Sequence, residues 1–264
     1  MTSVSNISNG ALIASNSAAK AQREFSKSIA KLSTGKRALY GADPAGQGIA
    51  DTLNAKSKSW YVAGRNAEDG ISAAQIAESA LLEIASLAQR LKELGIMADN
   101  ADIMTTSDMS ALDAEAAAIY DAIDSIVETT KFNNVSLLGF STKLHRVALA
   151  DNGSSIYFKT SDGFTSVGDN NTAEGADATA DIILAEVSTD LGNTAAGMSA
   201  FKARQSVAYS ASANLAAAAS RIEDTDYAEE SANLARLSIL NQSAMAMVAQ
   251  ANRANATFLN IINQ

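Results

Sequence analysis

The chain of 264 residues has 54 alanines, one proline, no cysteine and one histidine, and its 20 basic against 29 acidic residues give a net charge of −9. Abundant alanine and scarce proline favour helix, because alanine loses no side-chain entropy there. The composition excludes disulfides and cysteine-ligated zinc, argues against a site built from several histidines or a Ser-His-Asp triad, and argues against general nucleic-acid binding.

Charge is unevenly distributed along the chain. Residues 1–19 carry no charged side chain, residues 237–264 carry only Arg253, and residues 99–190 hold 16 acidic against 4 basic residues. Neutral chain ends with scattered aliphatic side chains predict segments that are disordered alone and become buried against other chains. The alternative is that both ends are amphipathic helices packed within the same protein.

We expect neither membrane insertion nor a conventional signal peptide. No segment has about 18 uninterrupted apolar residues. Residues 1–19 interleave Asn and Ser with aliphatic side chains and lack a basic start. If the protein leaves the cell, it uses a route that does not read such a signal.

The first part of the chain predicts two helices. Residues 5–33 repeat apolar side chains at helical spacing. Asp43 is expected to cap a long helix that begins with Pro44 and continues to about Asn100. Within this helix, a 3-4-3-4 spacing predicts a coiled-coil seam of Ala74, Ala77, Leu81, Ile84, Ala88, Leu91, Gly95 and Ala98.

The centre of the chain changes pattern. A helix that starts at Ser107 or Asp108 is expected to end near Thr130. Residues 144–149 and 156–158 predict a β-hairpin, in which Asn152-Gly153 would form a type I′ turn. Residues 160–178 are rich in Gly, Asp, Asn and Thr and are expected to form a loop, so we expect the region 141–180 to tolerate deletion.

The C-terminal part returns to helix. Helical spacing resumes by about Asp181, with breaks expected at Gly192 and Gly197, and a last helix follows residues 224–226. This order of elements predicts a mainly α fold. Its N- and C-terminal halves would close into a long antiparallel helical bundle or coiled coil, with a small β-hairpin-containing central insertion.

The sequence offers no site for chemistry. Residues 43–48 contain closely spaced glycines, but they lack the Gly-Lys-Ser/Thr ending of a phosphate-binding loop and predict a turn and a helix start. His145 has no Cys or His partner and is expected to be a surface or sheet residue. We therefore predict no catalytic residue, no cofactor, no metal site and no enzymatic activity.

Motifs at both ends of the chain resemble those of bacterial flagellin, in order and over nearly the whole length. They are residues 32–37 (LSTGKR), 43–46 (DPAG), 65–72 (RNAEDGIS), 89–94 (QRLKEL), 132–135 (FNNV) and 220–230 (SRIEDTDYAEE). Two features depart from the family. Residues 258–264 differ from its common leucine-rich, Arg-terminated tail, and residues 141–190 are too few for a large outer domain. Because of these departures, the chain could instead be a hook–filament junction protein, which shares the terminal halves.

The resemblance implies three domains. Residues 1–43 and 222–264 would form an inner terminal coiled-coil domain, residues 44–140 and 180–221 a middle helical domain, and residues 141–179 a small outward-facing insertion of hairpin and loop. It also implies a structural subunit that polymerises into the flagellar filament for swimming motility. A secreted coiled-coil binding protein of a type III system is a rival from another class.

The same resemblance implies partners and a location. The chain would form a homopolymer, meet the filament cap and the hook-junction proteins, bind an export chaperone, and pass through the flagellar type III export apparatus to the extracellular flagellum. A host Toll-like receptor is a further implied partner. Neither nucleic acid nor a membrane is expected as a partner.

Two sets of residues are expected to make contacts between molecules. The candidate patch for lateral contacts or receptor recognition is Gln89, Arg90, Glu93, Leu94 and Glu115, which match positions recognised in related flagellins. The apolar side chains expected to be buried on assembly are Ile7, Leu12, Phe25, Ile29, Leu32, Leu234, Leu237, Val248, Phe258, Leu259, Ile261 and Ile262.

Overall fold

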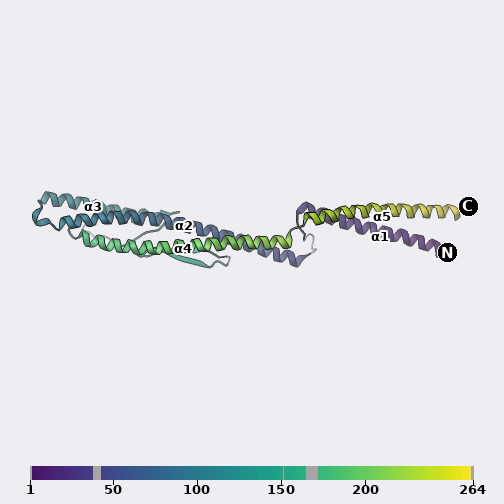
Figure 1. The fold of residues 1–264 in the computed structure, drawn as a ribbon, viewed down its shortest axis with the longest axis horizontal. Helices are drawn as coiled ribbons and strands as arrows, with labels where there is room; N and C mark the ends of the chain where they lie inside the picture. Colours follow the sequence, from purple (N-terminus) through teal and green to yellow (C-terminus); the bar gives the residue numbers. More distant parts are fainter. Residues whose placement is uncertain (1, 38–42, 151, 165–171, 263–264) are drawn as a thin grey trace. The chain divides into compact units, whose positions relative to one another are not determined.

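The computed structural model describes residues 2–37, 43–150, 152–164 and 172–262, without the side chains of residues 2–11, 255 and 258–262. The described part is mainly helical and has a small β region in the middle of the chain (Figure 1), so the predicted fold class is confirmed. Its elements are α1 (Thr2–Thr34), α2 (Pro44–Ala98), a 3-10 helix (Ala101–Ile103), α3 (Thr106–Thr129), β1 (Lys131–Phe132), β2 (Val135–Ser136), β3 (Lys143–Ala148), β4 (Ser155–Ser161), α4 (Ala176–Glu223) and α5 (Tyr227–Ile262).

The chain divides into two compact units. Unit 1 comprises Met1–Asn54 and Leu215–Gln264, and unit 2 comprises Ala55–Asn214. Each unit therefore combines segments from both halves of the sequence, which is how an antiparallel closure of the two halves is built. The division falls inside α2 and α4 and not at the turn before Pro44.

In unit 1, α1 and α5 lie side by side and antiparallel (Figure 1). Helix α1 ends at Thr34, and the next residue, Gly35, has a φ of +71°, a left-handed conformation that glycine adopts without strain. Hydrogen bonds from the Arg37 N–H to the Glu223 carbonyl and from the Thr225 N–H to the Gly35 carbonyl hold the two chain segments together. The predicted helix over residues 5–33 is confirmed.

The predicted seam of α2 lies in the core of unit 2. All eight of its residues are buried, and Leu81, Ile84 and Leu91 have no exposed surface. Tyr120 of α3 and Phe201 of α4 belong to the same buried cluster. At Gly95, α2 approaches the start of α4 so closely that an added Cβ would lie 2.2 Å from the backbone nitrogen of Asp177.

Gly95→Ala should destabilise unit 2 by about 1–3 kcal/mol, because the new methyl group meets backbone that cannot rotate away. Gly192→Ala is the matched control, since Gly192 is exposed in α4 and has nothing within 4 Å of its Cβ position. There, the higher helix propensity of alanine should add about 0.5–1 kcal/mol. Urea unfolding followed by circular dichroism measures both changes. Stabilisation by both substitutions would contradict the close approach.

Local hydrogen bonds fix where α2 and α3 begin. Asp43 precedes α2, as predicted, and its Oδ1 accepts the Gly46 N–H at 2.9 Å. Helix α3 begins at Thr106, one or two residues before the predicted start. The Thr105 hydroxyl accepts the Asp108 N–H at 3.2 Å, and the Asp108 carboxylate accepts the Thr105 N–H at 3.1 Å. This reciprocal pair is a capping box.

Helix α4 corrects two predictions. It begins at Ala176, five residues before the predicted start, and it runs without the breaks predicted at Gly192 and Gly197. A glycine inside a helix costs only about 1 kcal/mol relative to alanine, which tertiary packing readily offsets. At Gly197, that packing is visible, because an added Cβ would lie 2.9 Å from the Phe158 Cβ. Because Gly197 has no side chain, the β3–β4 hairpin can pack directly against the surface of α4 at this position.

The predicted β-hairpin exists, but its turn differs. Strands β3 and β4 are antiparallel, with Ala148 opposite Ser155. Gly153 has φ +77° and donates its N–H to the Ala150 carbonyl, so it is the fourth residue of the turn, whereas the predicted type I′ turn would place Asn152 and Gly153 at the two central positions. A turn with the positive φ that type I′ requires at both central residues instead joins β1 to β2, where Asn133 and Asn134 have φ values of +47° and +65°.

The hairpin and the chain that follows it are part of the core of unit 2. Leu149, Phe158 and Phe164 are all buried and belong to the same cluster as the α2 seam. The Phe158 ring meets the Phe201 ring edge-on, with 5.0 Å between centroids. Deletion of residues 141–180 would therefore remove side chains from the core of unit 2, and the expectation that filaments tolerate this deletion stays a prediction.

Among the described residues, one helix is long and apolar enough over part of its length to cross a membrane by length and composition alone. This helix is α2. This test admits windows with polar residues, whereas the sequence criterion asked for about 18 uninterrupted apolar residues, so the expectation that the chain does not span a membrane stays a prediction. The feature is weak evidence for a membrane, because the core helix of a protein without membrane contact has the same composition, and α2 supplies the buried seam of unit 2.

Candidate assembly surfaces

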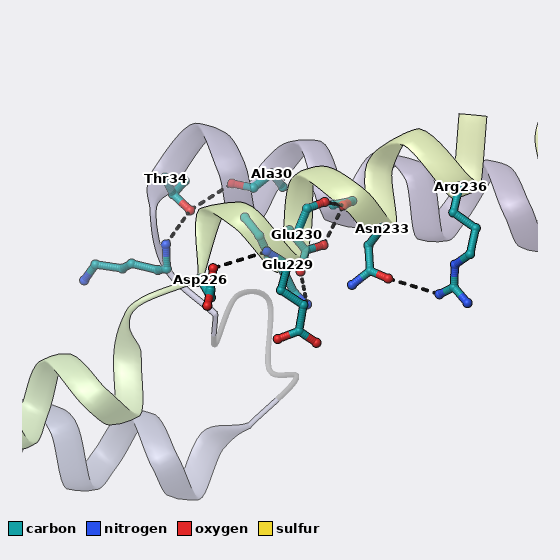
Figure 2. A network of polar contacts seen from close by, with 10 residues as sticks. Ala30, Thr34, Asp226, Glu229, Glu230, Asn233 and Arg236 are labelled. Carbon is teal, nitrogen blue, oxygen red and sulfur yellow. Dashed lines mark hydrogen bonds and ion pairs between the residues drawn. The ribbon is translucent and has the colours of Figure 1, made fainter. Parts of the chain in front are cut away.

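Polar contacts join the two helices of unit 1 near the start of α5. Glu230 accepts a hydrogen bond from the Ser28 hydroxyl through Oε1, and its Oε2 lies 3.4 Å from the Lys31 Nζ. Ser28 is 1% exposed, so its hydroxyl depends on this partner. Figure 2 shows the start of α5, where the Asp226 carboxylate accepts the Ala228 and Glu229 N–H groups at 2.8 and 3.2 Å.

Beyond this polar junction, unit 1 leaves much of its apolar surface uncovered. Two helices alone cannot enclose their apolar stripes. Ile239 and Met247 of α5 are each 64% exposed, and Leu12 of α1 is 61% exposed. A groove of about 430 Å³ runs between the helices and is lined by Ser17, Lys20, Ala21, Glu24, Leu237, Leu240, Ser243, Ala244 and Met247. Uncovered apolar area on this scale indicates an interaction surface.

The residues that the sequence assigned to assembly fall into three groups. Leu12 and Ile29 are exposed in the single chain. A second group is half-buried between the helices and comprises Phe25, Leu32, Leu234, Leu237 and Val248. The remaining five have side chains outside the described part and are Ile7, Phe258, Leu259, Ile261 and Ile262. Their role in assembly stays a prediction.

The second predicted set forms a charged patch on unit 2. Arg90 donates from Nε and Nη2 to Glu115 Oε1 at 2.9 and 2.7 Å and from Nη1 to Glu93 Oε2 at 2.8 Å. These hydrogen bonds, first to Glu93 and then to Glu115, raise the pKa of the Arg90 guanidinium. Gln89 is exposed beside them, whereas Leu94 has no exposed surface and supports the patch from the core.

His145 lies in β3, as the sequence predicted for a surface or sheet residue. Its Nε2 is 2.9 Å from the Thr160 Oγ1, and the Thr160 hydroxyl donates in turn to the Leu137 carbonyl. The His145 ring is half-buried and packs against Phe158, with 5.3 Å between centroids. Within the described part of the chain, no group of three or more His, Asp or Glu side chains could hold a metal ion.

Burial lowers the pKa of His145 below its ordinary value of 6.5, and the Lys143 charge adds to this effect while a backbone hydrogen bond opposes it. The unfolded chain therefore binds this proton more readily than the folded chain does. The stability that the neutral ring contributes is complete above about pH 6.5 and is lost as the pH falls through the folded pKa. His145→Gln should remove this part of the pH dependence of urea unfolding, and an unchanged profile would contradict it.

Sequence reasoning missed the contacts that hold these surfaces in place. Ser28 and Glu230 are separated by 202 positions, so no local spacing connects them. Asp113 accepts the Ala173 N–H at 2.8 Å across 60 positions, which is again too far for any local spacing to show. The one available signal was the motif at residues 220–230, whose acidic residues include Glu223, Asp226 and Glu230.

Comparison with known proteins identifies the family. The bacterial flagellin N-terminal helical region matches residues 6–142, and the bacterial flagellin C-terminal helical region matches residues 179–262. A flagellin of Halalkalibacterium halodurans is 32% identical over 89% of this chain and 91% of its own length, and a flagellin of Bacillus subtilis is 29% identical over 89% and 92%. The crystal structure of Bacillus cereus flagellin aligns with 57% of this chain and 88% of its own, at 23% identity and a TM-score of 0.39. The two helical regions that pair in units 1 and 2 are those of the family, and the chain belongs to the bacterial flagellins.

Proposed function

We propose that this flagellar filament subunit serves swimming motility after export through the flagellar type III apparatus to the extracellular flagellum. Family membership supports a structural subunit that polymerises with its own copies and is not an enzyme. The observation that carries the proposal is the uncovered apolar surface of unit 1, which includes Leu12, Ile239 and Met247. Neighbouring copies would cover it in the filament.

The energetics of assembly follow from this surface. Ordering a chain end costs roughly 1–2 kcal/mol per residue, and contacts must offset that cost. Within unit 1, the described part of α1 packs against α5. Copies at a filament end add the missing contacts, so growth on an existing end is favoured over new assembly in solution. This argument supports assembly at the tip under a cap protein.

We extend the proposal to the domains and partners that the family resemblance implies. Residues 1–43 and 222–264 would form the inner domain, 44–140 and 180–221 the middle domain, and 141–179 the outward-facing part. The exposed side chains of the hairpin, Leu144 and Tyr157, support an outward face there. The hook-junction proteins, the cap and an export chaperone would be the partners.

Seeded growth tests the proposed function. Purified chain is added to short filament seeds and observed by electron microscopy, and long filaments are expected. A hook–filament junction protein or a secreted type III binding protein would not extend the seeds. For export and motility, deletion of the gene should abolish swimming, and removal of the type III apparatus should retain the chain inside the cell.

We also propose that the patch of Gln89, Arg90, Glu93, Leu94 and Glu115 makes lateral contacts and is what a host Toll-like receptor recognises. Its support is the exposed Arg90 guanidinium, which Glu93 and Glu115 hold in one orientation. Arg90→Ala should reduce receptor-reporter activation by about tenfold or more, since a charge-assisted contact contributes about 1.5–3 kcal/mol. Arg90→Lys keeps the positive charge but loses the planar guanidinium that can donate several hydrogen bonds at once. Its receptor activation should lie between those of the wild type and Arg90→Ala. Full activation by Arg90→Ala would contradict the assignment.

A further inference from the structure

Two tyrosine rings from distant parts of the sequence lie against each other in unit 2. The rings of Tyr61 in α2 and Tyr209 in α4 have 5.7 Å between their centroids and an angle of 58° between their planes. This separation is typical of aromatic rings in direct contact. In the part of the chain that the structure describes, no other two tyrosine rings pack together. The pair therefore places two phenol groups at one point where α2 meets α4.

Gly64 determines where the Tyr209 ring lies. A Cβ added at Gly64 would be 2.8 Å from the Tyr209 Cε1 and 2.9 Å from its Cζ, so the ring rests directly on the backbone of α2. Tyr61, about one turn earlier in the same helix, is 53% exposed. Exposed side chains change rotamer within nanoseconds. The Tyr209 ring is thus held on the helix surface, and the Tyr61 ring is free to turn toward it.

The Tyr209 hydroxyl has a proton acceptor in place. It donates a hydrogen bond to Glu68 Oε1 at 2.8 Å, and the Gln205 Nε2 donates to the same oxygen at 2.9 Å. The hydrogen bond to Glu68 raises the pKa of the Tyr209 hydroxyl, partial burial and the charge of Glu68 add to this effect, and Arg65 opposes it. The phenol therefore keeps its proton at neutral pH and directs it at a carboxylate.

A phenol in this arrangement can lose an electron and a proton together. Removal of one electron makes the phenol a strong acid, so its proton moves to the Glu68 carboxylate and from there to water, since Glu68 is exposed. A neutral tyrosyl radical remains on Tyr209, with its unpaired electron shared between the oxygen and the ring carbons. The Tyr61 ring is already in contact with it, and such proximity strongly favours reaction within the molecule.

We propose that Tyr61 and Tyr209 form a dityrosine cross-link when the chain meets a peroxide and a one-electron peroxidase. Each phenol gives up one electron and one proton, and a carbon–carbon bond forms between the two ring carbons next to the hydroxyl groups. The hydrogen on each of these carbons then moves to the oxygen, which restores both phenols. The two electrons and two protons reduce one hydrogen peroxide to two water molecules. The new bond ties α2 to α4 in a chain that has no cysteine for a disulfide.

Peroxidase treatment of the monomer tests the cross-link. The full chain is treated with horseradish peroxidase and hydrogen peroxide, digested with trypsin and examined by mass spectrometry. The two tyrosines lie in the tryptic peptides 59–65 and 205–221, and the expected product has the sum of their masses less two hydrogen atoms. Fragmentation should place the bond on Tyr61 and not on the neighbouring Trp60. Dityrosine fluorescence should rise while the chain stays monomeric on a denaturing gel.

Single substitutions separate this pair from exposed tyrosines in general. Tyr61→Phe and Tyr209→Phe should each abolish the linked peptides, because phenylalanine forms no phenoxyl radical. Tyr157→Phe and Tyr227→Phe are the matched controls and should leave the yield unchanged, although these side chains are 57% and 56% exposed. Glu68→Gln keeps an oxygen that can accept the hydrogen bond but is a far weaker base. It should slow the formation of the linked peptides by about tenfold or more.

The cross-link should also stabilise unit 2. The treated wild type should unfold at a temperature about 5 °C or more above that of the untreated chain, because the bond closes a long loop in the unfolded state. Treated Tyr61→Phe should show no such rise, and the untreated variant should unfold like the wild type. Absence of the linked peptides, an equal yield from Tyr61→Phe, or cross-links that join copies in place of the internal product would overturn the proposal. Because monomers are used, these outcomes do not depend on filament growth.

Discussion

Ile239→Asp should stop filament growth while leaving the monomer intact. Ile239 is 64% exposed on α5, so the free chain loses little when it is replaced. If assembly buries this position in an apolar contact, the substitution places a carboxylate there without a partner, at a cost of several kcal/mol for every added subunit. The extension rate of seeds at neutral pH should fall about 100-fold or more.

Two measurements isolate the effect of Ile239→Asp. The monomer should keep its helical content and its unfolding midpoint, because isoleucine and aspartate have similar helix propensities. Ile239→Leu keeps the apolar surface and should extend seeds at close to the wild-type rate. Growth of the aspartate variant at the wild-type rate would mean that this face of α5 stays in solvent, and the assembly role assigned to unit 1 would fail.

Phe158→Ala should be the most damaging single change to unit 2. The ring is 4% exposed and packs against His145 and Phe201, with centroid separations of 5.3 and 5.0 Å. Truncation removes this contact and leaves a cavity beside Gly197, which has no side chain to fill it. The free energy of unfolding should fall by about 3–5 kcal/mol.

Urea unfolding monitored by circular dichroism measures that loss. Tyr157→Ala is the matched control, because the neighbouring side chain in β4 is 57% exposed. It should cost less than about 1 kcal/mol. Equal and small losses in the two variants would show that the hairpin is only loosely attached to the helices.

The sequence was most informative where one helix carries its own pattern. The 3-4-3-4 spacing from Ala74 to Ala98 identified eight positions, and all of them are buried. Asp43 and Pro44 marked the start of α2 correctly, because a cap acts on the three residues beside it. The neutral chain ends predicted segments that become buried against other chains. Leu12 and Ile239 are exposed in the single chain, and their burial by neighbouring copies stays a prediction.

What the sequence could not supply were contacts between distant segments. Gly197 was interpreted as a helix break, because local propensity cannot show that Phe158 will lie on it. The Asn152-Gly153 pair was assigned the type I′ turn that Asn133-Asn134 makes, since composition favours Asn-Gly and the actual turn depends on strand register. The burial of Phe164 in the core could not be predicted either, because the neighbouring residues in sequence have the composition of a loop.

The antiparallel pairing of α1 with α5 determines the order in which the two units can fold when the chain emerges from one end, during synthesis or during export. Ser28 meets Glu230 across 202 positions, whereas Gly95 meets Asp177 across a much shorter loop. A chain delivered from either end presents every segment of unit 2 before both helices of unit 1 are available. Unit 1 is therefore the last part that can close, and the surface expected to join neighbouring copies matures only after nearly the whole polypeptide has arrived.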